Sequence, residues 1–172
     1  MDYRYLPICS VEGDAFNSIN LNNSSNAQAT APMSTAAAYG KATELAAFAI
    51  NCGKAGGMWS FASGMDTKAN GLYSHAEGYS TIASGKTQHA EGTYNIEDTE
   101  NKYAHIIGNG YYDIENKQTI RSNAHTLDWS GNAWYSGSVE SKSVILSSPN
   151  GTRYEITVGD DGQLTANQVA EV

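Results

Sequence analysis

The sequence predicts an all-β protein: a shaft of trimeric parallel β-roll (β-solenoid) structure, with a short N-terminal helix region and a small antiparallel β domain at the C-terminus. Three observations predict this fold. A fourteen-residue repeat occupies the middle of the chain, the C-terminal third carries hairpin signals, and the composition has 17 Gly, only 3 Pro and 16% charged residues. Low charge with many turn-forming residues is typical of short strands separated by turns.

The first segment, residues 1–56, is predicted to be an attachment or collar segment. Its Ala-rich stretch 34–51 favours a helix. Ser34 or Thr35 can cap the first turn by accepting a hydrogen bond from a free backbone N–H, and Gly53 lies where a helix often ends in a left-handed residue. Two interpretations stay open: a short linker helix or irregular collar, and a segment that attaches the protein and starts a trimer.

The repeat covers residues 57–110. It is clearest in three successive units, GMWSFASGMDTKAN, GLYSHAEGYSTIAS and GKTQHAEGTYNIED, which together span 57–98. A degenerate fourth unit follows after two extra residues at AHIIG (104–108). The aligned units share two glycine columns and an alanine column: Gly57, Gly71 and Gly85; Gly64, Gly78 and Gly92; Ala62, Ala76 and Ala90.

A period of fourteen residues fits one coil of a parallel β-solenoid. Two strands of about four or five residues, each followed by a glycine-containing turn, use up the unit, and coils stack at about 4.8 Å. Glycine is needed where a corner takes positive φ or where backbone approaches backbone. Alanine is needed where the interior is too narrow for a larger side chain.

So thin a roll buries little apolar area, at roughly 25 cal/mol per Å². We therefore expect each chain to need neighbours. A threefold bundle would cover the flanks of the rolls and remove exposed strand edges, so the first predicted partner is the protein itself, as a homotrimer.

Residues 111–172 are predicted to form a β-rich tip domain. SVILSS (143–148) and TRYEITV (152–158) flank an Asn-Gly pair, the strongest short hairpin signal. Apolar and polar residues alternate along the second of these strands, which is typical of a half-buried strand. QLTA, after the GDDG turn, can add a third strand.

His75 and His89 occupy one column of the repeat, which His105 can continue. Stacked coils would place successive imidazoles about 5 Å apart. Two interpretations follow: a metal or anion site on a threefold axis, since neutral imidazole is a common ligand, and a hydrogen-bonding ladder packed at a subunit contact. We favour the ladder, so neither a metal nor a cofactor is expected. Glu77 and Glu91 also align and should face water, where their repulsion is screened.

The predicted receptor-binding residues are aromatic side chains around turn signals near the start of the tip: Trp129, Trp134, Tyr135, Tyr111 and Tyr112. Aromatic faces stack on the C–H surfaces of sugars, and adjacent Asn and Asp residues supply polar contacts. The alternative interpretation is that the tryptophans form the buried core of the tip domain.

Net charge and the length of the apolar runs argue against nucleic-acid binding and membrane insertion. The chain carries 10 Lys+Arg against 18 Asp+Glu, a net charge of -8, so it should repel a nucleic-acid backbone. The longest apolar run, LAAFAI (45–50), is too short for membrane insertion. The first residues lack the basic and apolar pattern of a secretory signal.

No enzymatic activity is expected. The sequence has no GxSxG motif. A glycoside hydrolase needs two carboxylates at a defined separation, and the candidates are scattered: Asp113, Glu115, Asp128 and Asp160. Cys9 and Cys52 form no CxxC motif, and we expect free thiols.

The SFASG, SHAEG and QHAEG units resemble the head repeats of trimeric autotransporter adhesins. The longer stretch YSHAEGYSTIASG is similar to tail-fibre and tail-appendage proteins of phages and prophages of Gram-positive bacteria. The segment IRSNAHTLDWSGNAWYSGSV (120–139) resembles one that often follows such repeats in phage tail proteins. The resemblance covers residues 57–92 closely and the sequence from there to the C-terminus more loosely.

This resemblance implies a homotrimeric subunit of a phage tail fibre that mediates attachment to the host surface. Such a protein would be made in the host cytoplasm and act extracellularly in the virion, with other tail or baseplate proteins and a host cell-surface glycan as partners. Two alternatives stay open. One is a head fragment of a bacterial trimeric surface adhesin, which would require a signal peptide and a membrane anchor. The other is a structural virion protein without receptor binding.

Overall fold

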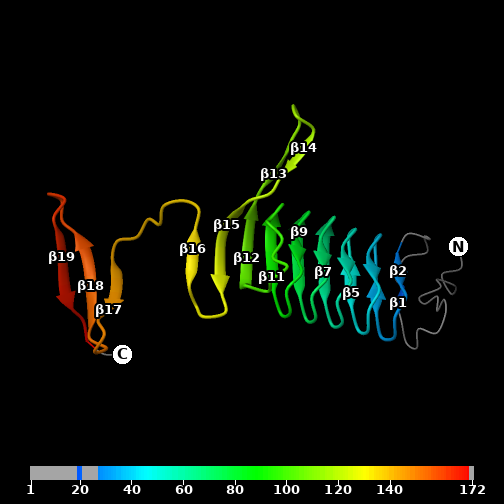
Figure 1. Cartoon of the computed structure of the whole chain (residues 1–172), viewed down its shortest axis with the longest axis horizontal. Helices are drawn as coiled ribbons and strands as arrows, with labels where there is room; N and C mark the ends of the chain where they lie inside the picture. Colours follow the sequence, from blue (N-terminus) through cyan, green and yellow to red (C-terminus); the bar gives the residue numbers. More distant parts are fainter. Residues whose placement is uncertain (1–18, 21–26, 171–172) are drawn as a thin grey trace, which may run out of the picture. The chain divides into compact units, whose positions relative to one another are not determined.

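The computed structural model describes residues 19–20 and 27–170, and all regular structure in these residues is β (Figure 1). The predicted all-β class, with a parallel solenoid followed by antiparallel strands, is confirmed. The chain divides into two compact units, of which the first ends at Ser136 and the second begins at Gly137. The second unit is therefore shorter than the predicted tip. Cys9 and much of the predicted collar lie outside the described residues.

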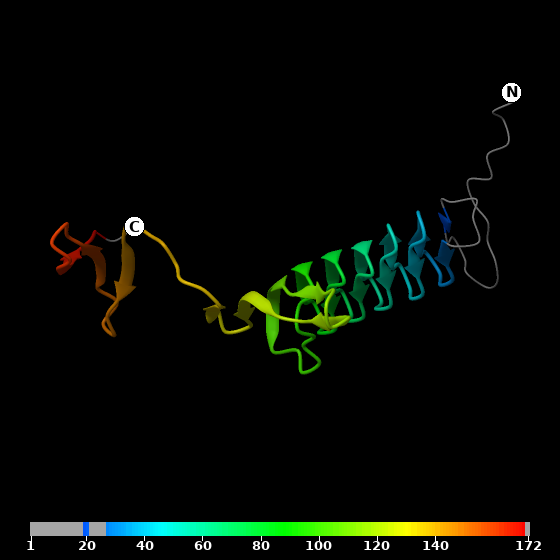
Figure 2. The same cartoon turned by 90° about the horizontal axis from the view of Figure 1, so that it is seen from above.

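The first unit is a solenoid of two sheets that face each other across a narrow interior (Figure 2). One sheet runs in the order β1 (Ile19–Asn20), β3 (Thr35–Ala36), β5 (Phe48–Ile50), β7 (Phe61–Met65), β9 (His75–Tyr79), β11 (His89–Thr93), β12 (Tyr103–Asn109), β15 (Asn123–Asp128) and β16 (Ala133–Tyr135). The other contains β10 (Ile82–Ala83), β8 (Lys68–Ala69), β6 (Lys54–Ala55), β4 (Lys41–Ala42) and β2 (Gln28–Ala29). Successive strands along the chain alternate between the two sheets from β2 to β11, so each coil contributes one strand to each sheet.

The pairing of residues between neighbouring coils gives the length of each coil. Thr35 pairs with Phe48 and Phe48 with Phe61, thirteen residues further each time. Phe61 pairs with His75 and His75 with His89, fourteen residues further each time. The extra residue enters with β7, which has 5 residues where β5 has 3. The predicted fourteen-residue period thus holds from Phe61 to His89, and the coils from Thr35 to Phe61 are one residue shorter. The steps at the two ends, from Ile19 to Thr35 and from His89 to His105, are sixteen residues.

The predicted helix over residues 34–51 is wrong, because this segment forms β3, β4 and β5 with turns between them. Its buried alanines recur at alternating steps of six and seven residues, as Ala36, Ala42, Ala49 and Ala55 show. A helix would need apolar residues at steps of three and four. The parallel coils therefore begin before residue 57, within the segment that was predicted to be a collar.

The interior of the solenoid consists almost entirely of alanine methyl groups. Buried polar side chains such as Thr67, Thr81 and Gln88 lie just before β8, β10 and β11, and each strand from β2 to β11 points one alanine inward. The hydrophobic cluster gains no larger side chain until Ile106 in β12. This explains why the two sheets can approach so closely. The fully buried alanines are Ala36, Ala42, Ala49, Ala55, Ala62, Ala69, Ala76, Ala83 and Ala90.

Glycine occupies two columns of the repeat, and the second column combines two requirements for it. In the first column, a Cβ added to Gly57 would lie 1.9 Å from the carbonyl oxygen of Gly71 in the next coil. In the second, Gly64, Gly78 and Gly92 have φ angles of 111°, 104° and 88°, a region that L-residues with side chains rarely adopt. The second column also has close backbone approach, because a Cβ added to Gly64 would lie 2.1 Å from the carbonyl oxygen of Gly78. Both roles predicted for glycine thus occur, close approach in both columns and positive φ in the second.

The C-terminal end of the solenoid is closed by antiparallel strands. β12 pairs in parallel with β11 on one side and antiparallel with β15 on the other, and β16 then pairs antiparallel with β15. The chain between β12 and β15 makes a two-stranded hairpin of β13 (Tyr111–Asp113) and β14 (Gln118–Ile120), which extends from the sheet in Figure 1.

A side chain continues the five-stranded sheet past β10, its last strand. The Oδ1 atom of Asn95 accepts a hydrogen bond from the backbone N–H of Ile82 at 2.7 Å, and its Nδ2 atom donates to the carbonyl of Ile82 at 2.9 Å. Nδ2 also donates to the carbonyl of Ile96. The fully buried amide of Asn95 therefore takes the place that a backbone peptide group would fill in one more coil.

The second unit is a three-stranded antiparallel sheet of β17 (Val144–Ser147), β18 (Arg153–Val158) and β19 (Leu164–Gln168). The predicted hairpin and third strand are confirmed, with the Asn-Gly turn between β17 and β18. Val144, Ile145 and Leu146 follow one another in β17, so they point to alternate faces. All three are exposed in the single chain, and this sheet therefore has uncovered apolar side chains on both faces.

Candidate functional site

A pocket of about 430 Å³ opens at the antiparallel end of the first unit. Its walls come from β12, β15 and β16 and from the chain segments that flank these strands. One aromatic wall residue is Trp134 of β16, one of the predicted receptor-binding residues. The pocket is lined by Ile96, Tyr103, Asn109, Ser122, Asn123, Thr126, Trp134 and Ser136.

The turn before β16 places Trp134 in this pocket. Asp128 ends β15, and its Oδ1 atom accepts hydrogen bonds from the backbone N–H groups of Ser130 and Asn132, while Oδ2 accepts from the side chain of Asn132. The side-chain hydrogen bond from Asn132, followed by that residue's backbone N–H, lowers the pKa of Asp128. This turn sets the register in which Trp134 lies opposite Thr126.

The lining offers the chemistry of a sugar-binding pocket. Trp134 is 54% exposed, and Asn109 and Asn123 contribute amides to the same lining. The side-chain oxygen of Asn123 accepts from the backbone N–H of Ile96, and that of Asn109 accepts from the hydroxyl of Ser122. Within the described part of the chain no hydrogen bond engages the amide nitrogen of either asparagine, so both can donate to a ligand.

The other four predicted receptor-binding residues lie outside the pocket. Tyr135 follows Trp134 in β16 and points to the opposite face, where its ring contacts His125 at 4.6 Å. The indole N–H of Trp129 donates to the carbonyl of Asn101 at 2.9 Å. Tyr111 and Tyr112 belong to β13 in the hairpin and are both exposed.

None of the aromatic residues predicted to contact a receptor is buried, and both Trp129 and Trp134 are about half exposed. The structure thus favours neither tryptophan as a core residue of the tip. Sequence reasoning missed Tyr103, Asn109 and Asn123, which line the pocket. Their proximity follows from the antiparallel register of β12 and β15, for which the repeat pattern contains no signal.

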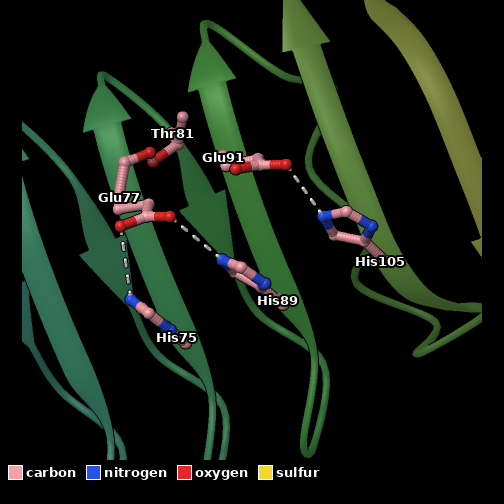
Figure 3. A network of polar contacts seen from close by, with 6 residues as sticks. All are labelled: His75, Glu77, Thr81, His89, Glu91 and His105. Carbon is pink, nitrogen blue, oxygen red and sulfur yellow. Dashed lines mark hydrogen bonds and ion pairs between the residues drawn. The ribbon is translucent and has the colours of Figure 1, made fainter.

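A second set of polar residues lies on the outer face of the nine-stranded sheet (Figure 3). The rings of His75, His89 and His105 stack along β9, β11 and β12, with centroids 4.5 Å and 5.0 Å apart. Glu77 and Glu91 lie beside them, two residues further along β9 and β11. We call these five residues the His/Glu column.

The carboxylates in the His/Glu column face imidazole nitrogens. The Nε2 atom of His75 lies 3.8 Å from one carboxylate oxygen of Glu77, and the Nε2 atom of His89 lies 3.6 Å from the other. The Nε2 atom of His105 lies 3.2 Å from Glu91. The predicted alignment of the histidines thus occurs, but the rings stack on one another and do not form a hydrogen-bonding ladder with one another.

The Nε2 atoms of these three histidines are shielded from solvent and have no hydrogen-bond partner within the described residues. The side chains as a whole stay partly exposed in the single chain. Burial lowers the pKa of His75, as does the neighbouring His89, and the nearby carboxylates of Glu77 and Glu91 offset part of this. The neutral form of the His75 imidazole, which has a free lone pair on one nitrogen, is therefore favoured.

Aromatic rings extend this row in both directions. Phe48 stacks on Phe61 at 5.3 Å, and Phe61 contacts the ring of His75 edge-on at 4.7 Å. At the other end, His125 lies 6.0 Å from His105. The outer face of this sheet is therefore aromatic along most of the solenoid. The corresponding outward positions of the other sheet, by contrast, carry exposed polar side chains over four strands: Gln28, Lys41, Lys54 and Lys68.

Comparisons of the chain with protein-family models, with curated proteins and with solved structures found no match. No helix in residues 19–20 and 27–170 is long and apolar enough to cross a membrane. Cys52 is exposed and its thiol is free.

Proposed function

We propose that this protein is a structural and adhesive subunit of a phage tail fibre, which forms a homotrimer and attaches the virion to a glycan of the host surface. The observation that carries the proposal is the pocket beside Trp134 at the end of a rigid solenoid. The solenoid acts as the shaft and the pocket as the receptor site. Three identical weak sites on one particle then act together, so that avidity exceeds the affinity of each site.

Uncovered apolar surface supports the homotrimer. The aromatic row on the nine-stranded sheet and the apolar side chains on both faces of the C-terminal sheet are uncovered in the single chain. Contiguous uncovered apolar surface is typical of a contact with another chain. A sheet of three short strands without a covered face is also only marginally stable. Copies of the same chain around a threefold axis would bury these surfaces.

The oligomeric state tests this part of the proposal. We expect light scattering coupled to size exclusion to give a mass of about 55 kDa, three times the 18.4 kDa of one chain. A folded species at the mass of one chain, stable across dilution, would contradict the homotrimer.

The receptor site is tested by Trp134→Ala. Loss of a central aromatic anchor costs about 2 kcal/mol or more, or roughly 30-fold in affinity at each site, and avidity enlarges the loss. Binding of labelled protein would be measured on a glycan array and on whole cells of a panel of Gram-positive bacteria. The matched control is Trp129→Ala, which removes an equally exposed tryptophan outside the pocket and should leave binding unchanged.

The outcomes separate the candidate functions. Equal binding by the Trp134→Ala variant and the unmodified protein would exclude this pocket as the receptor site. Absence of binding by the unmodified protein to every glycan and cell type would favour a structural virion protein without receptor binding. Tail-assembly genes beside the coding sequence would favour the phage protein over a bacterial surface adhesin.

A further inference from the structure

The His/Glu column contains two groups of three potential metal ligands: His75, Glu77 and His89, and then His89, Glu91 and His105. In each group the ligand atoms lie within 4.8 Å of one another. We propose that His75, Glu77 and His89 bind one divalent transition-metal ion of the zinc class. The site joins β9 to β11, and it is independent of the glycan pocket.

The first argument is the unmet bonding capacity of the imidazoles. The Nε2 atoms of His75 and His89 are shielded from solvent and have no hydrogen-bond partner among the described residues. Buried polar atoms nearly always have a partner, and those that lack one call for an ion or a water molecule. A metal ion between the two nitrogens and the carboxylate of Glu77 supplies that partner to both imidazoles at once.

The second argument is the spacing of the ligand atoms. Zinc bonds to nitrogen and oxygen of about 2.0–2.1 Å in a tetrahedron place the ligand atoms about 3.3 Å apart. The two Nε2 atoms lie 3.8 Å and 3.6 Å from the oxygens of Glu77. These distances run to different oxygens of Glu77, and one ligand atom from each of the three residues lies within 4.8 Å of the other two. A contraction of up to about 1.5 Å brings the three atoms to the tetrahedral spacing, and a water molecule can take the fourth position, as in zinc sites with three protein ligands.

The rings must turn to bind. His75 and His89 are stacked at an interplanar angle of 10°, so their nitrogen lone pairs run nearly parallel and do not yet converge on one point. The torsion that turns an imidazole about its Cβ–Cγ bond is broad, and both side chains are partly exposed in the single chain. A rotation of each ring about this bond aims the lone pairs at an ion beside Glu77.

The ligand types and the shared histidine define the ion and its stoichiometry. Two imidazole nitrogens with one carboxylate suit zinc, nickel or copper, whereas calcium and magnesium prefer oxygen ligands alone. His89 belongs to both groups, and its Nε2 atom has one lone pair to donate, so one chain binds one ion. We place that ion at Glu77, because this carboxylate faces two imidazoles whereas Glu91 pairs with His105 alone.

The test is a zinc titration of the full chain without a polyhistidine tag, in competition with a chromophoric chelator. We expect about one zinc ion per chain. His89→Gln should weaken zinc binding by more than about 100-fold, since loss of a direct ligand exceeds the 10- to 100-fold cost of losing an outer partner. His105→Gln removes a histidine of the same column that is not a ligand of the proposed ion, so it should leave the affinity within about threefold.

Circular dichroism of both variants checks that the fold is kept, and zinc should raise the melting temperature of the unmodified protein and of His105→Gln but not of His89→Gln. Failure of the unmodified protein to bind zinc would overturn the proposal. So would unchanged binding by His89→Gln, or an equal loss in both variants, which would place the ion at Glu91.

Discussion

Replacing Gly57 with alanine is expected to lower the free energy of unfolding by about 4 kcal/mol or more. The new Cβ would lie 1.9 Å from the carbonyl oxygen of Gly71 and 2.9 Å from that of Asn70. Both atoms belong to the backbone of the next coil, so no side chain can turn aside to make room. The coils would have to separate, and separation breaks the hydrogen bonds that stack them.

The neighbouring residue provides a matched control. A Cβ added to Gly56 would meet the side-chain oxygen of Asn70 at 3.4 Å and the Cε atom of Lys54 at 3.9 Å, both of them ordinary contacts with side chains. Gly56→Ala should therefore change stability by less than about 1 kcal/mol. Chemical unfolding of both variants followed by circular dichroism, at equal chain concentration, makes the comparison. If both variants unfold at the same denaturant concentration, close backbone approach is not what requires glycine at position 57.

This contrast shows how much of the solenoid the sequence predicts. A repeated glycine at one position per coil marks a place where a side chain cannot fit, and the fourteen-residue period fits two strands and two corners. Fold class and repeat could therefore be inferred from Gly57, Gly71 and their equivalents, and the C-terminal hairpin from its Asn-Gly pair. The same reasoning cannot tell which of the two columns has positive φ in addition to close contact, because both conditions select glycine.

The first coils were not predicted because their most prominent feature, a high alanine content, has two explanations. Alanine is both the best helix former and the residue that fits a narrow solenoid interior. In residues 34–51 the abundance of alanine favoured a helix, whereas the spacing of Ala36, Ala42 and Ala49 is that of inward positions in successive strands. Extending the alanine column backward from Ala62 in steps of six and seven would have found these coils.

The candidate sites depend on how side chains of neighbouring strands are arranged. The sequence predicts this arrangement only in part. The repeat predicts that His75 and His89 stack, because both occupy one position of the coil. It does not predict that their Nε2 atoms face the two oxygens of Glu77. The pocket is even harder to predict from the sequence, because Tyr103 and Trp134 come together through antiparallel pairings that lie outside the repeat.

The second large effect is expected at the end of the five-stranded sheet, in Asn95→Ala. The side chain of Asn95 is fully buried and makes three hydrogen bonds, two of them to the peptide groups of Ile82. Its removal leaves a buried N–H and a buried C=O without partners, at about 1–3 kcal/mol each. We expect a total loss of about 3–5 kcal/mol in the free energy of unfolding.

Asn70→Ala is the matched control for this change. Asn70 follows β8 just as Ser84 follows β10 in the next coil, and the side chain of Asn70 is exposed. Asn70→Ala should therefore lower the free energy of unfolding by less than about 0.5 kcal/mol. Both variants would be compared by chemical unfolding, and their association state by sedimentation. An uncapped sheet edge pairs readily with other chains, so Asn95→Ala should also form larger species than Asn70→Ala. Equal stability and equal size would mean that Asn95 does not close this sheet, and that another group keeps the end of the solenoid from adding strands.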